Sequence, residues 1–375
     1  MRVLHVADRL SDRGGAYAWT RGVLEALSAD HELRLVVGRD EGAPRPPCAL
    51  DVRPGLEGRG AERFDLDGLV ASFRPDVVHV HNVVNPAVLE WAAARGGAVL
   101  TAQDHRFFCP GRGKWTLEGE PCTTPFGKEA CAACFDDSAY YAEVRSLTER
   151  RLAAARRLPV TVLSRYMREQ LVAAGVPAAR VQVVPPFVER PREEAAASGP
   201  PCVLFVGRLV EAKGVRDALA AWRLSRVDLP LVFAGTGPLR EELAALAAAG
   251  ERVEVLGWVP REAMPAVFAR ARALVMPSRW QEPFGIAGLE ALVHGVPVVA
   301  WESGGIGEWH PGPGLVRWGD LPGLAEALRG AVARRISLPP RFDRDEALGR
   351  LLGLYARVAG AREARGASRA RVSGG

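Results

Sequence analysis

Short apolar runs rich in β-branched residues alternate with amphipathic stretches along almost the whole chain, and this alternation constrains the fold most strongly. In the first half we expect strands at Val3–Val6, Leu33–Val37, Asp76–Val80, Ala98–Thr101, Val160–Leu163 and Val181–Val184. In the second half we expect them at Cys202–Phe205, Leu231–Phe233, Val253–Leu256, Ala273–Met276 and Val298–Trp301. Helical patterns lie between the strands, for example Ala16–Leu27 and Ala139–Arg157. This order is typical of α/β proteins with parallel sheets and crossover helices.

The chain of 375 residues is long enough for two α/β domains. The stretch PPFVERPREEAAASGPP has no apolar period and predicts a linker over 188–200, between domains at 1–187 and 201–341. A last helical pattern, Glu346–Ala359, predicts a terminal helix over 342–360. The basic remainder, 361–375, lacks large apolar residues, and we expect it to be disordered.

Composition places the chain among globular proteins, with 48% hydrophobic and 25% charged residues. No apolar run is long enough to cross a bilayer, and the opening MRVLHVADRL reads as a strand rather than a signal peptide. We therefore expect a cytoplasmic protein. The net charge of +5 favours anionic partners only mildly. Only three of the 49 basic residues are lysines (Lys114, Lys128 and Lys213), so a lysine near a phosphate-like site attracts interest.

Segments of the second half fall at strand ends, where open α/β sheets bind ligands. Arg208 and Lys213 follow the first strand of this half, and two cations there suit a diphosphate. Gly235 and Gly237 form a turn after the second strand that would let backbone approach a ligand. After the third strand, the main chain of Trp258 and Val259 could meet a flat base.

The segment that follows the fourth strand of this half, MPSRWQEPFGIAGLEALVHGVPVVA, is the most informative. Glu282 precedes a helix that we expect to start near Pro283. The free N–H groups around Phe284 and Gly285 would then form an anion site at the helix N-terminus. Glu290 lies about two turns further along the same helix.

This pair of glutamates, eight positions apart with Pro-Phe-Gly after the first, resembles the E-x7-E motif of retaining glycosyltransferases of the GT-B fold, family 4. The stretches GRLVEAKGV, AGTGP and GPGLVRWGD are similar to that family's motifs and occur in its order. The resemblance implies two doubly wound Rossmann-like domains facing a cleft, with the terminal helix returning to the first. It implies that Glu282 contacts the donor sugar, Glu290 the ribose, and Arg208 and Lys213 the diphosphate.

The first half then supplies the acceptor side. Gly14 and Gly15 form a turn before a helix, and in similar enzymes this pair faces the donor phosphates. His81 ends a buried strand and is the better candidate for lining a cleft, whereas His79 in mid-strand is expected to be structural. The family usually has a histidine followed by an aspartate after the next strand. Here Gln103 takes the histidine position, Asp104 is kept and His105 follows, which puts the histidine's role in doubt.

Four cysteines (Cys109, Cys122, Cys131 and Cys134) are spaced x12, x8 and x2 in a loop at about 104–136. Four thiolates that include one close pair predict a structural zinc that organises this loop, with free thiols as the alternative. Asp65 and Asp67 could suggest the D-x-D metal site of another glycosyltransferase fold. Their place at a helix start favours capping, so we expect no catalytic metal.

The sequence therefore predicts transfer of a sugar from a nucleotide-diphosphate donor to a sugar, lipid-linked or small-molecule acceptor. A GT-B nucleotide-sugar 2-epimerase and a non-catalytic nucleotide-sugar binder remain open. A zinc module for nucleic acid is disfavoured, because too few basic and aromatic residues surround the cysteines. Arginines on the helix at Ala139–Arg157 could contact the inner face of a membrane, although a solvated helix face is the favoured explanation.

Overall fold

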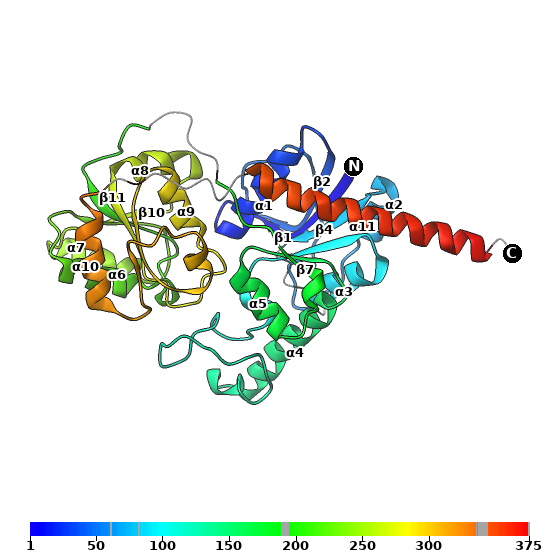
Figure 1. The fold of residues 1–375 in the computed structure, drawn as a ribbon, viewed down its shortest axis with the longest axis horizontal. Helices are drawn as coiled ribbons and strands as arrows, with labels where there is room; N and C mark the ends of the chain where they lie inside the picture. Colours follow the sequence, from blue (N-terminus) through cyan, green and yellow to red (C-terminus); the bar gives the residue numbers. More distant parts are fainter. Residues whose placement is uncertain are drawn as a thin grey trace. The chain divides into compact units, whose positions relative to one another are not determined.

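The protein, seen as a computed structural model, is described over residues 1–60, 62–81, 83, 85–188, 195–334, 336 and 344–373. It divides into two compact units, each with its own sheet (Figure 1). Unit 1 comprises Met1–Gly111, Thr124–Pro185 and Asp345–Gly375, and unit 2 comprises Arg112–Thr123 and Pro186–Arg344. The division at Pro185–Pro186 lies beside the expected linker, of which 189–194 fall outside the described residues.

Unit 1 is built on a seven-stranded parallel sheet in the order β3-β2-β1-β4-β5-β6-β7. Its strands are β1 (Arg2–Leu10), β2 (Glu32–Asp40), β3 (Ala49–Val52), β4 (Val77–His81), β5 (Ala98–Ala102), β6 (Val160–Val162) and β7 (Val181–Val183). Its α-helices are α1 (Gly15–Leu27), α2 (Asp67–Phe73), α3 (Pro86–Arg95), α4 (Ser138–Ala155), α5 (Arg165–Ala173) and α11 (Arg344–Ser373). The strand order reverses between β1 and β4, and such switch points are where doubly wound sheets bind ligands.

Unit 2 is built on a six-stranded parallel sheet in the order β10-β9-β8-β11-β12-β13. Its strands are β8 (Cys202–Val206), β9 (Leu231–Ala234), β10 (Val253–Gly257), β11 (Ala271–Met276), β12 (Val298–Trp301) and β13 (Leu315–Val316). Its α-helices are α6 (Val215–Ser225), α7 (Arg240–Ala248), α8 (Met264–Arg270), α9 (Ile286–Val293) and α10 (Leu321–Ala331). Here the switch point lies between β8 and β11.

Capping and apolar burial explain why these segments fold as they do. The side chains of Asn85, Asp137 and Ser164 accept hydrogen bonds from first-turn N–H groups of α3, α4 and α5. The central strands bury nearly every side chain, as the near-continuous apolar runs predict for parallel sheets covered on both faces. Each unit therefore has a core of its own.

The C-terminal helix is longer than the sequence indicates. Helix α11 belongs to unit 1, where Leu351 and Tyr355 are fully buried, and it continues through Ser373. The expectation of disorder after residue 360 is therefore wrong for the part that the structure describes. Alanine, arginine and glutamate favour helix, and extending an established helix adds one hydrogen bond per residue without a new nucleus.

None of the described helices is both long and apolar enough to span a membrane. Several arginines of α4 and its C-terminal end are engaged within the fold. Arg150 forms a two-pronged ion pair with Glu90, and Arg156 donates to the carbonyl oxygens of Ala174 and Gly175. Arg151 is buried, and burial lowers its pKa to about 10. These contacts give the arginines a structural role that needs no membrane.

Candidate functional site

The residues predicted to hold a diphosphate come together at the switch point of unit 2. Arg208 and Lys213 follow β8, and Glu282 follows the neighbouring strand β11. Lys213 Nζ lies 2.6 Å from Glu282 Oε1, and Ser278 Oγ donates to the same oxygen at 2.5 Å. The structure thus brings a cation and a carboxylate that lie far apart in the sequence into direct contact.

Close packing of two loops produces this contact. The carbonyl oxygen of Ala212 accepts hydrogen bonds from the backbone N–H groups of Arg279 (3.0 Å) and Trp280 (3.1 Å). Gly214, at φ 70°, lies where a Cβ would be 1.8 Å from the carbonyl oxygen of Pro277. Glycine is required there because any side chain would push the Lys213 turn away from the loop that carries Glu282.

The side chains of Arg208 and Lys213 both lie over the indole ring of Trp280. Lys213 Nζ lies 4.4 Å and Arg208 Cζ 5.9 Å from its ring centroid, within the range of cation–π attraction. Arg208 is exposed and forms no ion pair with any carboxylate that the structure describes. Its charge is therefore available to a ligand.

Glu282 is held as a carboxylate. It is 4% exposed, and burial alone would raise its pKa, but the Lys213 ammonium and the hydrogen bonds from Lys213 and Ser278 outweigh burial and lower the pKa. The backbone of the loop is also held in place, because the carbonyl oxygen of Glu282 accepts a hydrogen bond from the Gly305 N–H at 2.7 Å. An ionised and rigid acceptor of this kind suits the hydroxyl groups of a sugar.

The helix that follows begins later than expected. Helix α9 starts at Ile286 with Gly285 as its N-cap at φ 88°, and not near Pro283. Phe284 is buried, and its carbonyl oxygen accepts the Trp309 indole N–H at 2.5 Å. This contact holds the Pro-Phe-Gly stretch out of the helix. Glu290 lies on α9, and burial raises its pKa despite the nearby Arg261 charge.

The glycine turn after β9 packs against backbone. A Cβ at Gly235 would lie 1.8 Å from the carbonyl oxygen of Gly207, and one at Gly237 would lie 2.4 Å from that of Leu209. These glycines therefore let the β8 and β9 loops lie against each other. Trp258 and Val259 follow β10 and are partly exposed, as a surface for a base requires.

In unit 1, the predicted acceptor residues follow β5 and are mostly buried. Gln103 Nε2 donates to the carbonyl oxygen of Ala16 at 3.4 Å, which ties this loop to the first turn of α1 beside Gly14 and Gly15. Gln103 Oε1 is buried and has no hydrogen-bond partner among the residues that the structure describes. Asp104 pairs with Arg106, and His105 Nε2 lies 3.4 Å from the Tyr166 hydroxyl.

His81 lies in the core instead of lining an open surface. His5, His79 and His81 are all 0% exposed, and His5 Nδ1 lies 2.9 Å from His81 Nε2. His79 uses both ring nitrogens, with the Tyr355 hydroxyl at 2.5 Å and the Thr101 hydroxyl at 2.6 Å. Sequence reasoning missed His5, which becomes visible only through the β1–β4 register that places it beside His79.

Among the described residues, these histidines form the only set of three or more potential metal ligands whose atoms lie within 4.8 Å of one another. The four cysteines of the predicted zinc site form no such set, and none of them is in a disulfide. Cys131 and Cys134 do bracket a tight turn, in which the Cys134 N–H donates to the Cys131 carbonyl oxygen at 3.3 Å. As placed, the cysteines do not enclose a metal ion.

Asp65 and Asp67 lie at the start of α2, where Leu66 is the N-cap residue, and of the two only Asp65 accepts first-turn N–H groups. Asp65 Oδ1 accepts the N–H of Asp67 at 3.1 Å, and Asp67 Oδ1 accepts from Trp91 and Arg95.

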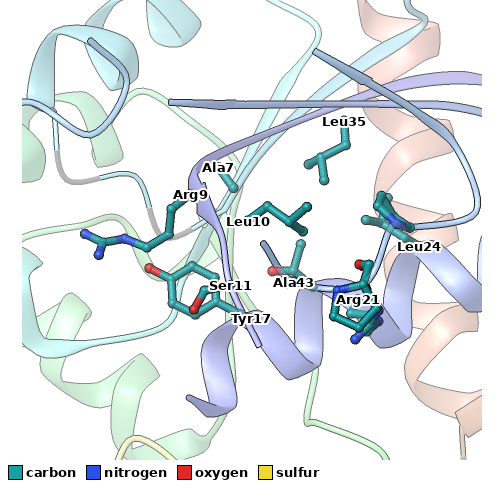
Figure 2. A pocket seen from close by; sticks show the side chains of 12 residues that line it. Ala7, Arg9, Leu10, Ser11, Tyr17, Arg21, Leu24, Leu35 and Ala43 are labelled. Atoms are coloured by element: carbon teal, nitrogen blue, oxygen red, sulfur yellow. Dashed lines mark hydrogen bonds between the residues drawn. The ribbon is translucent and has the colours of Figure 1, made fainter. Parts of the chain in front are cut away.

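A pocket of about 370 Å³, open solvent at its mouth included, lies at the end of β1 beside α1 (Figure 2). Leu10, Leu24, Leu35 and Ala43 give it an apolar lining, and Tyr17 lies at one end (Figure 2). The Tyr17 hydroxyl donates to the buried Asp8 carboxylate at 3.1 Å. None of His81, Gln103, Asp104 and His105 lines this pocket.

Comparison with known proteins identifies the family and the fold. The family described as "Glycosyl transferases group 1" matches residues 200–334, and "Glycosyltransferase Family 4" matches residues 13–192. A GDP-mannose-dependent alpha-(1-6)-phosphatidylinositol monomannoside mannosyltransferase of Mycolicibacterium smegmatis is 35% identical over 40% of this chain and 45% of its own. A 2-deoxystreptamine N-acetyl-D-glucosaminyltransferase of Streptomyces fradiae is 37% identical over 40% of this chain and 38% of its own. The chain thus spans less than half the length of these relatives.

Two solved structures share the fold along the whole chain. Sucrose-phosphate synthase of Thermosynechococcus elongatus matches with a TM-score of 0.64 at 18% identity and covers 100% of both chains. Anabaena Alr3699/HepE in complex with UDP-glucose matches with a TM-score of 0.64 at 16% identity, over 98% of this chain and 100% of its own. The two Rossmann-like units thus form a GT-B fold. With both family matches and the Lys213–Glu282 pair at the expected strand ends, the chain belongs to the group 1, family 4 glycosyltransferases.

Proposed function

We propose that the protein transfers a glycosyl group from a nucleoside-diphosphate sugar to an acceptor hydroxyl, with retention of anomeric configuration. The observation that carries this proposal is the partly buried Lys213–Glu282 contact at the switch point of unit 2, with Arg208 beside it on the Trp280 ring. A carboxylate for sugar hydroxyls and cations for a diphosphate are the two chemistries that a sugar-nucleotide donor requires.

In the proposed reaction the bond between the anomeric carbon and the diphosphate oxygen breaks, and a bond from that carbon to the acceptor oxygen forms on the same face. Arg208 and Lys213 stabilise the negative charge that develops on the departing diphosphate. The acceptor's proton passes to the departing phosphate oxygen. Glu282 orients the sugar through its hydroxyls, and its low pKa keeps it an acceptor at neutral pH.

Gln103 fits this scheme as a positioning residue. A neutral amide cannot take a proton as a general base, and the departing phosphate makes such a base unnecessary. The buried Gln103 Oε1 has no partner within the described part of the chain and can accept a hydrogen bond from a substrate hydroxyl. The amide nitrogen meanwhile holds the first turn of α1.

The test begins with thermal unfolding in the presence of UDP-glucose, GDP-mannose and related sugar nucleotides. A donor at about 100 times its dissociation constant adds about 2.7 kcal/mol to stability. The stabilising donor is then incubated with small-molecule and lipid-linked acceptors, and the anomeric configuration of the product is read by NMR. Retention supports the proposal, whereas an inverted product contradicts the same-face mechanism.

The two alternatives give different products from the same assay. An epimerase would convert the donor into an isomeric nucleotide-sugar, with the diphosphate still attached, without any acceptor. A non-catalytic binder would be stabilised by the donor, yet would leave it intact with every acceptor.

A further inference from the structure

Unit 2 contains a hairpin, Arg112–Thr123, that the chain supplies from between β5 and α4 of unit 1. Trp115 pairs with Pro121 in an antiparallel bridge, and the N–H of Cys122 donates to the carbonyl oxygen of Lys114 at 2.8 Å. The turn is closed by the Gly119 N–H, which donates to the Thr116 carbonyl oxygen at 3.2 Å. These hydrogen bonds give the segment a definite conformation.

The hairpin lies against the loop that carries Glu282. The backbone N–H of Gln281 donates to the carbonyl oxygen of Gly113 at 3.1 Å. At the turn, a Cβ on Gly119 would lie 2.9 Å from Arg279 Nη1. The hairpin therefore touches both ends of the stretch 279–281, immediately before the carboxylate of the proposed donor site.

Lys114 has an unusual backbone conformation for its position. Of the described residues, three other than glycine have a positive φ: Arg74 (49°), Lys114 (62°) and Arg226 (53°). Arg74 and Arg226 are exposed and end α2 and α6, where a left-handed residue is a common helix terminator. Lys114 is only 4% exposed and follows no helix.

A buried lysine at a backbone position that favours glycine indicates that its side chain serves a purpose. Left-handed backbone is costly for a residue with a Cβ, and such conformations persist mostly where function requires them. Its neighbour Gly113 is bonded to the residue next to Glu282, so the flexible four-carbon stem of Lys114 starts beside the donor site.

The charge balance of that site calls for a further cation. Lys213 is already paired with Glu282, whereas Arg208 has no carboxylate partner among the described residues. A departing nucleoside diphosphate carries more than one negative charge, and catalysis depends on stabilising the charge that appears as the bond breaks.

We propose that Lys114 is a substrate-binding residue of unit 2, whose ammonium binds the terminal phosphate of the nucleoside diphosphate together with Arg208 and Lys213. The proposal rests on the function proposed above. It makes the hairpin part of the donor site, although the chain supplies it from the acceptor-side half.

The sharpest test is Lys114→Gly, because glycine adopts the same φ without strain and only the side chain is lost. The matched control is Arg226→Gly, which makes the same change at an exposed helix end of the same unit. Binding of UDP, UMP, GDP and GMP is measured by calorimetry. We expect Lys114→Gly to weaken binding of the matching diphosphate about tenfold or more, as loss of a charged partner does, and to leave the monophosphate unchanged. The Arg226→Gly variant should bind the diphosphate and the monophosphate as tightly as the wild type does.

A second variant, Lys114→Met, keeps an unbranched apolar stem and removes only the charge. Thermal unfolding of each variant shows that it is folded before binding is measured. If the wild type binds UDP or GDP and both Lys114 variants bind it equally well, Lys114 is not a phosphate ligand. A wild type that binds neither diphosphate contradicts the proposed function itself, and the role of Lys114 falls with it.

Discussion

Glu282 and Lys213 depend on each other at the scale of single residues, because both charges are largely withdrawn from water and meet at 2.6 Å. Removing one partner of such a pair leaves the other charge uncompensated, which costs about 3–5 kcal/mol when the site is fully buried. Lys213 keeps 19% of its side chain exposed, so the cost of Lys213→Ala should fall below that range.

The first prediction separates chemistry from folding at this pair. Glu282→Gln keeps the shape of the side chain and should reduce turnover by about two orders of magnitude or more, while nucleoside-diphosphate affinity stays near that of the wild type. Lys213→Ala should lower both the turnover and the affinity for the nucleoside diphosphate. Steady-state kinetics beside calorimetric binding of the diphosphate distinguishes the two variants. Full activity in Lys213→Ala would remove the diphosphate role assigned to this residue.

Gln103 supports a second prediction on the acceptor side. Gln103→Ala should lower transfer to the acceptor and spare binding of the sugar nucleotide, since the amide positions a hydroxyl and the first turn of α1. His105→Ala should have a milder effect, because His105 is buried beside Tyr166 and Phe108. Turnover of each variant is measured with the identified donor and acceptor. Loss of transfer in His105→Ala but not in Gln103→Ala would reverse these roles.

At the scale of elements, periodicity predicts the buried strands and misses two of the four edge strands. All eleven expected strands are present within a few residues of their predicted bounds. The two that were missed, β3 and β13, are edge strands in which no residue is fully buried, so they lack the continuous apolar run that marks a central strand. The start of α9 was misplaced because the contact between Trp309 and Phe284 is not encoded locally.

The candidate site, too, could be predicted from the sequence only in part. Strand ends carry Arg208, Lys213 and Glu282, and their convergence follows from the rule that ligands bind at switch points. The hairpin could not be predicted, because Gly113 meets Gln281 only after two units have folded from interleaved segments. The burial of His81 also depends on a register that the sequence does not specify.

The paired strands β1 and β4 give a third prediction, concerning pH. Burial lowers the pKa of His5 to about 3 and that of His79 and His81 well below the usual value. The unfolded chain binds protons at these histidines with a pKa of about 6.5, so stability is complete above that pH and falls below it, by about 1.4 kcal/mol per pH unit for each histidine. Guanidinium unfolding at pH 7 and pH 5 should show this loss, and His5→Leu should make it shallower. If the free energy of unfolding did not change over this pH interval, these histidines would not be buried in their neutral form.

The cysteine loop gives a fourth prediction. The turn at Cys131 and Cys134 supplies the close pair of a zinc site, and we expect purified protein to hold about one zinc per chain. The loop must then rearrange, since the thiols do not gather as placed. Metal analysis of the wild type and of a Cys131→Ser/Cys134→Ser variant checks this. Metal-free protein with titratable thiols at all four positions would exclude zinc.

At the scale of the whole molecule, two units are assembled from interleaved segments, and each depends on a distant piece of chain. Unit 2 takes its hairpin from within the N-terminal half, and unit 1 takes α11 from the C-terminal end. The buried face of α11 contributes Leu351, Leu354 and Tyr355 to unit 1. The two halves therefore cannot be separated by one cut at the linker without exposing apolar surface.

The last prediction concerns this dependence on the C-terminal helix. The Tyr355 hydroxyl meets His79 Nδ1 inside the histidine cluster, so Tyr355→Phe leaves a buried ring nitrogen without a partner and should destabilise unit 1 by about 1–3 kcal/mol. Truncation after residue 343 should be more severe, because it also exposes the apolar side chains that α11 covers. Unit 2 keeps its own core and its cations, so the site at β8 and β11 should still bind nucleoside diphosphate. Hydrogen exchange followed by mass spectrometry, with and without the diphosphate, measures both units in one sample. We expect faster exchange in β1 and β4 of each variant and unchanged ligand protection around Lys213 and Glu282. Equal loss of protection in both units would show that they fold as a single cooperative body.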